Sequence, residues 1–165
     1  MKRLVFVLSA LMLPLPAGAN IEFQYYDRNP SDGFSITNMD GCPLQDVEII
    51  FDLKSSIGGV VFDTQPGPPG LNRSQDVSIL EGEDYLTQTP FVQDGSHTMT
   101  LEIKSLPPEG VIFIGLDTDF VYGGQGAMMY TPQIDGGLVK MTDAAPVAFD
   151  NQGTAIIPGQ CGIIS

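Results

Sequence analysis

The sequence contains no tryptophan, one histidine and only two cysteines among its 165 residues. A single histidine, His97, excludes metal centres that are built from several histidines. The absence of tryptophan removes the side chain that stacks best against sugars and cations. Basic residues are also scarce, with seven lysines and arginines against twenty acids. After the first twenty residues no apolar run is long enough to span a bilayer.

The N-terminal segment has the pattern of a secretory signal peptide. Met1–Arg3 is short and basic, an apolar stretch follows, and the small residues Ala17–Ala19 resemble a cleavage site. We therefore predict a signal peptide over residues 1–19, cleaved after Ala19, and one domain over residues 20–165. An uncleaved membrane anchor is the alternative, but the apolar stretch is shorter than the ~20 residues that span a bilayer.

Removal of the signal peptide makes the chain more acidic. Without Lys2 and Arg3, twenty acids face five bases, which gives a net charge of −15. Such a surface repels nucleic acid and anionic lipid, so we predict no nucleic-acid partner and no membrane insertion after cleavage. The same surface attracts cations, although acidity can also serve only to keep an exported protein soluble. The predicted location is the periplasm or the extracellular space.

The two cysteines, Cys42 and Cys161, are predicted to form a disulfide, because export places them in an oxidising compartment. Neither has a second cysteine or a histidine nearby, so a zinc site is not expected. A bridge that closes a loop of about 100 residues stabilises a fold by about 4–5 kcal/mol in the chain-entropy model. Two free thiols are the alternative.

Apolar and polar residues alternate with a period of two in many segments, which is typical of half-buried strands. In residues 47–54 (VEIIFDLK) and 97–106 (HTMTLEIKSL), one set of alternate positions is apolar and the other polar. Further candidate strands are IEFQYYD, FSITN, GVVFDT, VSIL, VIFIGLD, AMMYTPQI, LVKMT, PVAFD and TAIIP. Glycines and prolines separate these segments. We predict an all-β fold, a single Ig-like antiparallel β-sandwich, in which residues 97–118 form a hairpin closed by LPPEG.

Two neighbouring pairs are expected to divide between the faces of their strands. Tyr25 and Tyr26 point to opposite faces, as do Met128 and Met129, so one member of each pair is expected to pack inward. This makes them core and half-core residues rather than a stacking surface for a ligand.

Two long segments resemble a known group of proteins. DGFSITNMDGCPLQDVEIIFDLKSSIGGVVFDT and FVQDGSHTMTLEIKSLPPEGVIFIGLDTD are similar to small exported proteobacterial proteins labelled "aggregation factor core". The resemblance begins near Asp32 and includes Cys42 and the acidic strand end at Asp117 and Asp119. The segment QPGPPG departs from the Gly/Ala-rich stretch that the family has there. The label implies similarity to an adhesion component of sponges, where cells cohere through calcium and acidic glycans, and it implies no catalytic motif.

The acidic strand end, VIFIGLDTDFVYGG, is the strongest candidate site. If the strand continues through Asp117 and Asp119, both carboxylates lie on one face about 6.5–7 Å apart. Carboxylates do not stay in an apolar core, so either the chain leaves the core here or a cation lies between them. Calcium takes about six to eight oxygen ligands. We therefore predict a calcium site at these two residues. Further ligands would be carbonyls of Gly123 and Gly124 and acids such as Asp63, Glu81, Glu83, Asp84 or Asp135.

The alternative is that Asp117 and Asp119 only solvate the end of a strand and block pairing with other chains. Catalysis has little support, because the sequence has no G-x-S-x-G, H-E-x-x-H or P-loop motif. His97 follows Asp94-Gly95-Ser96 and is expected to be an exposed turn residue. A pair of carboxylates for glycoside hydrolysis needs no local motif, but the chain is small for such an enzyme.

These observations together predict a non-catalytic exported module of the adhesion or aggregation type. Calcium would stabilise its acidic loops, and its partner would be a protein or an acidic glycan. The alternative function is a periplasmic accessory subunit that binds a protein or glycan without a metal.

Overall fold

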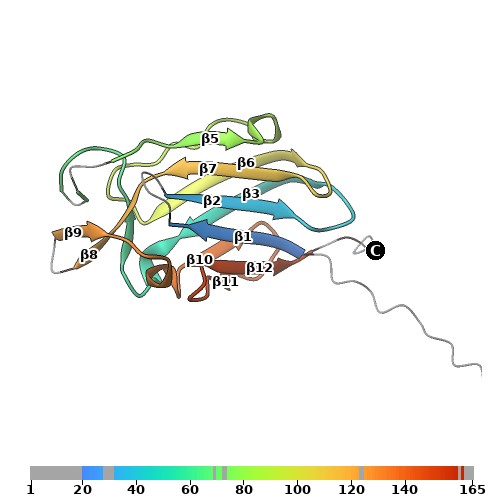
Figure 1. Cartoon of the computed structure of the whole chain (residues 1–165). Helices are drawn as coiled ribbons and strands as arrows, with labels where there is room; N and C mark the ends of the chain where they lie inside the picture. Colours follow the sequence, from blue (N-terminus) through green and yellow to red (C-terminus); the bar gives the residue numbers. More distant parts are fainter. Residues whose placement is uncertain are drawn as a thin grey trace, which may run out of the picture.

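The computed structural model describes residues 20–27, 32–68, 70–71, 74–122, 125–159 and 161. These segments form three antiparallel sheets, two of which pack face to face (Figure 1). The predicted all-β sandwich is thereby confirmed, whereas an Ig-like topology stays a prediction. Within the described segments, no helix has both the length and the apolar character needed to cross a bilayer.

The strands divide unequally among the sheets. The first sheet contains, in spatial order, β12 (Thr154–Pro158), β1 (Asn20–Tyr26), β2 (Asp32–Asn38), β7 (Val111–Leu116) and β5 (Ser78–Glu81). The second contains β11 (Val147–Ala148), β10 (Leu138–Met141), β3 (Leu44–Asp52) and β6 (Thr98–Leu106). The third contains β4 (Val60–Phe62), β8 (Thr118–Tyr122) and β9 (Gln125–Met128). Its hairpin β8–β9 projects from one end of the sandwich (Figure 1).

In the segments described above, three short 3-10 helices lie between strands: η1 (Leu53–Ser55), η2 (Glu83–Tyr85) and η3 (Thr131–Ile134). The predicted strand AMMYTPQI is therefore only partly correct, because β9 ends at Met128 and the rest of that segment turns into η3. Pro132 lies in the first turn of η3, where a missing backbone N–H has no cost.

The period-two pattern of the sequence explains which side chains are buried. In β1, Ile21, Phe23 and Tyr25 are buried, while the residues between them are only half-buried. In β6, Met99 and Leu101 face inward and their neighbours are exposed. Because successive side chains of a strand point to opposite faces, each of these strands contributes one apolar face to the sandwich.

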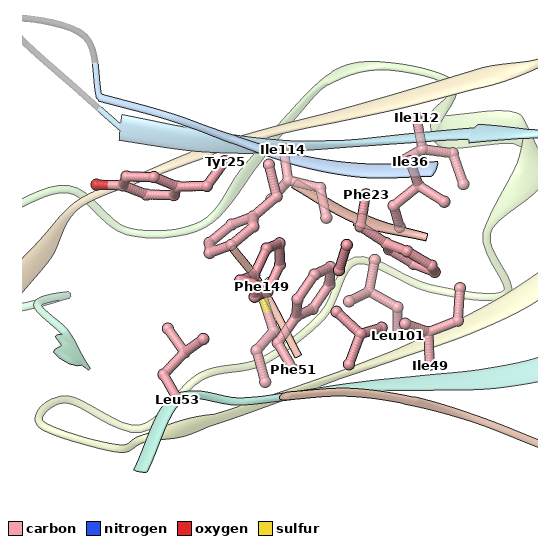
Figure 2. Close-up of a cluster of buried hydrophobic side chains, with 14 of the residues drawn as sticks. Phe23, Tyr25, Ile36, Ile49, Phe51, Leu53, Leu101, Ile112, Ile114 and Phe149 are labelled. Carbon is pink, nitrogen blue, oxygen red and sulfur yellow. The ribbon is translucent and has the colours of Figure 1, made fainter. Parts of the chain in front are cut away.

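An aromatic cluster joins the sheets at the centre of the core (Figure 2). Phe34 of β2 lies 4.7 Å from Phe51 of β3, measured between ring centroids, and thereby connects the first sheet to the second. Its ring also lies 5.2 Å from Tyr25, 5.9 Å from Phe149 and 6.3 Å from Phe62 of the third sheet. Burial of each such ring stabilises the fold by roughly 1.5–3 kcal/mol.

The predicted hairpin over residues 97–118 is wrong in one respect. Its two strands exist as β6 and β7, but β6 pairs with β3 and β7 pairs with β2 and β5. The LPPEG segment therefore carries the chain from one sheet to the other. The two prolines at its centre cannot donate ladder hydrogen bonds, which suits a crossing between sheets as well as a hairpin turn.

Asn38, at the end of β2, holds this crossing in place. Its side-chain amide donates to the carbonyl oxygens of Leu106 at 2.9 Å and Pro107 at 3.1 Å. Its backbone carbonyl accepts from the N–H of Glu109 at 2.8 Å, and its own N–H donates to the Gly110 carbonyl at 3.0 Å. One fully buried side chain thus fixes the corner between β6 and β7.

The predicted disulfide between Cys42 and Cys161 is present, with a Cα–Cα distance of 5.8 Å and a sequence separation of 119 residues. The buried carboxylate of Asp40 lies beside it and accepts hydrogen bonds from the N–H groups of Gly41 at 2.7 Å and Cys161 at 3.1 Å. The bridge therefore attaches the segment after β12 to the turn after β2.

We expect loss of the disulfide to destabilise the protein by about 4–5 kcal/mol, because the unfolded chain regains the entropy of a long open loop. A Cys42→Ser/Cys161→Ser double variant should show this loss in urea denaturation. The wild-type protein in reductant should match the variant, and reductant should not change the variant itself. Equal stability of wild type and variant would contradict the prediction.

Candidate functional site

The acidic strand end forms a corner between two sheets. β7 ends at Leu116, Asp117 belongs to no strand, and β8 begins at Thr118. The chain leaves the first sheet and enters the third at this point, so the strand does not continue through both acids. Asp117 is half-buried, whereas Asp119 is only 3% exposed. The interpretation of Asp119 as a solvated strand end is therefore wrong.

A third acid, Asp63, meets Asp119 at this corner. It directly follows β4, whose residue Val61 pairs with Asp119 in the third sheet. Asp63 is fully buried, and its carboxyl group lies within hydrogen-bonding reach of that of Asp119. The N–H of Leu71 donates to Oδ2 of Asp63 at 3.1 Å and to Oδ2 of Asp119 at 2.6 Å. Two buried carboxyl groups therefore converge on one backbone N–H.

The loop segment that provides this N–H is fitted closely against Asp63 at Gly70 and Leu71. A Cβ atom at Gly70 would lie 2.3 Å from Cγ of Asp63, so only glycine fits at this position. The backbone on either side is also tied to the corner. The Asp63 N–H donates to the Asp117 carbonyl at 3.0 Å, and the Gln75 N–H donates to the Asp63 carbonyl at 3.2 Å. The loop thus leaves and rejoins the sandwich beside the acid pair.

Burial, followed by the charge of Asp119, raises the pKa of Asp63 to about 7. Burial also raises the pKa of Asp119. Oδ1 of Asp63 is buried and has no hydrogen-bond partner. Two facing carboxyl groups in this setting repel one another when both are ionised. They are stable only when a proton or a cation lies between them.

A buried hydrogen-bond chain fixes the start of β8. The hydroxyl of Thr118 donates to Oδ2 of Asp32, as does its backbone N–H at 3.2 Å. Because the Thr118 proton is used there, the hydroxyl of Tyr25 donates to Thr118 Oγ1 at 2.9 Å. Figure 2 shows the Tyr25 hydroxyl pointing away from the aromatic cluster. Burial raises the pKa of Asp32, and burial together with Asp32 raises that of Tyr25.

Of the acids predicted as further calcium ligands, Asp63 lies beside Asp119 in the structure. Glu81, Glu83 and Asp84 instead line a separate surface hollow near Glu109. Gly123 and Gly124 lie outside the described residues.

Within the described part of the chain, one group of three potential metal ligands has its ligand atoms within 4.8 Å of one another: Asp40, Cys42 and Cys161. Its cysteines form the disulfide, so it is not a metal site. Asp63, Asp117 and Asp119 do not form a second such group, and the predicted calcium site stays a prediction.

His97 was predicted to be an exposed turn residue, and this is wrong. Its ring is half-buried, and Nδ1 forms a 2.7 Å hydrogen bond with the carbonyl oxygen of Val60. Its backbone carbonyl accepts from the N–H of Leu53 at 2.8 Å, so the residue links the start of β6 to the start of β4 and to η1. A histidine bonded in this way has a structural role between two sheets.

The two neighbouring pairs divide between faces as predicted. Tyr25 is 1% exposed while Tyr26 is half-buried, and Met129 is 4% exposed while Met128 is 57% exposed. Neither a model of a known protein family nor a curated protein sequence matches the chain. The resemblance to "aggregation factor core" proteins therefore stays a prediction.

We expect Tyr25→Phe to lower the free energy of unfolding by about 1–2 kcal/mol, because the variant loses a buried hydrogen bond to Thr118. Tyr26→Phe is the matched control. Its hydroxyl is 3.4 Å from Ser35 Oγ, which is long for this kind of bond, so a smaller loss is expected. Urea denaturation of both variants measures the difference. Equal losses would show that the Tyr25–Thr118–Asp32 chain has no special importance.

The raised pKa of Asp63 predicts how stability depends on pH in the absence of metal. The folded state keeps a proton up to about pH 7, whereas an ordinary aspartate releases it at a pKa of 3.8. The free energy of unfolding is therefore highest below pH 3.8. It falls as the pH rises from 3.8 to about 7, by up to about 1.4 kcal/mol per pH unit. Urea denaturation in chelator at several pH values should show this decline.

Asp63→Asn should flatten the decline, since the variant has no proton to lose at this position. A residual slope is expected, because Asp32 and Asp119 also have raised pKa values. Asp46→Asn, which removes an exposed acid on β3, should keep the wild-type slope. A free energy of unfolding that rises between pH 3.8 and about 7 in the wild-type protein would contradict the prediction.

Proposed function

We propose that this protein is a non-catalytic exported module of the adhesion or aggregation type, whose acidic loops act together with calcium. The observation that carries this proposal is the buried pair of Asp63 and Asp119, which lies beneath a loop at one end of the sandwich. A buried acid pair beside a surface loop suits a binding end that a cation stabilises. The disulfide supports export, because such bonds persist in oxidising compartments.

The surroundings of the acids favour binding over catalysis. Asp63 and Asp119 are closed off by Gly70 and Leu71, so a substrate has no direct access to them. His97 bonds to a backbone carbonyl and does not contact a nucleophile through that nitrogen. Catalysis needs a reacting group within reach of an acid or base. At this end of the sandwich the two acids instead accept a hydrogen bond from the loop backbone at Leu71.

Charge explains why an adhesive role would require a cation. At a net charge of −15 after signal cleavage, two copies of the protein, or one copy and an acidic glycan, repel each other at short range. Divalent cations can neutralise this repulsion and bridge carboxylates.

The alternative function, an accessory subunit that binds a protein or glycan without metal, is favoured by a different observation. Several apolar side chains are strongly exposed, among them Phe91 at 88%, Ile57 at 75% and Tyr130 at 60%. Exposed aromatic and aliphatic side chains can serve as anchors in an interface that does not depend on ions.

A bead assay tests the proposed function. Beads coated with the purified protein are mixed with one another, or with beads that carry an acidic polysaccharide, in calcium or in chelator. We expect clusters in millimolar calcium that disperse on addition of chelator, measured by light scattering. Magnesium at the same concentration controls for general screening of charge.

The outcomes separate the two functions. Calcium-dependent clustering supports the adhesive module, whereas clustering that persists in chelator favours the alternative. Beads that stay dispersed under every condition would overturn the adhesive function.

A further inference from the structure

We propose that Asp63 and Asp119 bind one calcium ion, with Asp117 nearby, and that this ion fastens the backbone at Gly70 and Leu71 to the end of the sandwich. The inference rests on the proposed function and deepens it, because it assigns the cation to defined residues and gives it a structural task. Asp63 lies 54 positions before Asp117 in the sequence and reaches the site only through the third sheet.

The unpartnered oxygen of Asp63 is the main argument for a ligand. The side chain is fully buried, yet its Oδ1 has no hydrogen-bond partner. Buried polar atoms without partners are rare, and each calls for an explanation, of which a bound ion is one. The unpartnered atom belongs to a carboxyl group that faces a second buried carboxyl group, that of Asp119. The two acidic side chains and an oxygen atom without a hydrogen-bond partner therefore lie at the same position.

The chemistry of the ligands selects the ion. The side chains at the corner offer carboxylate oxygens. Such oxygen ligands suit calcium better than zinc or copper, which prefer nitrogen and sulfur. Asp117 also acts electrostatically on Asp63 and adds to the negative field of the site. Magnesium is less suitable, because it demands a regular octahedral shell.

The contacts of the loop explain what the ion would stabilise. The Leu71 N–H donates to one oxygen of each carboxylate, and Gly70 packs directly against Asp63. If both acids are ionised and no cation is bound, their repulsion pushes apart the two groups that hold Leu71. A bound ion removes the repulsion and leaves both hydrogen bonds intact. Calcium binding and attachment of the loop are therefore coupled.

Calorimetric titration of the metal-free protein with calcium tests the site directly. We expect about one ion per chain, with a Kd on the order of 10⁻⁴–10⁻³ M as in other extracellular modules, and a rise in melting temperature on binding. Asp63→Asn and Asp119→Asn should each weaken binding by about tenfold or more. Asp46→Asn removes one exposed charge of the same kind and should bind as the wild type does.

A pair of glycine variants tests the site without any change of charge. Gly70→Ala places a methyl group against the Asp63 carboxylate and should weaken calcium binding by about tenfold. Gly41→Ala is the matched control, because a Cβ atom there meets nothing within 4 Å. Diffuse attraction of calcium to an acidic surface would be the same in both variants.

Several results would overturn the site. These are a wild-type protein that shows neither heat nor a change in melting temperature, an effect of Asp46→Asn equal to that of Asp63→Asn, or magnesium binding as tight as that of calcium. Circular dichroism confirms that each variant is folded. Calcium binding without bead clustering would leave the site in place and remove the adhesive function. Clustering without binding at Asp63 would do the reverse.

Discussion

The contact between Phe34 and Phe51 is the interaction on which the rest of the structure depends. It joins the two large sheets at the centre of the core, and the rings of Tyr25, Phe62 and Phe149 pack around it. Through Phe62 the cluster also holds the third sheet, whose first strand ends one residue before Asp63. The position of the buried Asp63 carboxyl group therefore follows from aromatic packing in the core.

Asp119, which faces Asp63, is held in position by a different kind of contact. The chain passes from the first sheet to the third at Asp117, and Thr118 is fixed there by hydrogen bonds with Tyr25 and Asp32. Asp119 follows immediately and is directed toward Asp63. Apolar packing on one side and a buried hydrogen-bond chain on the other thus bring together two carboxylates that would otherwise separate. Such an arrangement costs free energy without a proton or a cation, which is typical of sites that have a function.

Local pattern predicted much of the fold but less of the site. The alternation in residues 47–54 and 97–106, and the two cysteines of a chain predicted to be exported, were sufficient to predict the sandwich and its bridge. The hairpin assigned to residues 97–118 failed because a Pro-Pro turn is compatible with pairing and with crossing, and the choice depends on Asn38, which is distant in sequence. Asp119 could be singled out because it follows an apolar run. Asp63 was only one of five acids named as possible further calcium ligands. Nothing local distinguishes it, since its burial arises from β4 pairing with β8.

The disulfide has a mechanical consequence for any load applied to the C-terminal side of the domain. β1 and β12 are neighbouring antiparallel strands, so tension applied to their outer ends would unzip their hydrogen bonds one at a time. Cys161 follows β12 and is covalently joined to Cys42, which follows β2 at the same end of the sheet. A pull from the C-terminal side is thereby transmitted through a covalent link to the turn after β2, and β12 carries no load. The hairpin β8–β9 lies at the opposite end of the sandwich from the C-terminal end of β12 in Figure 1, so this load path does not run through it.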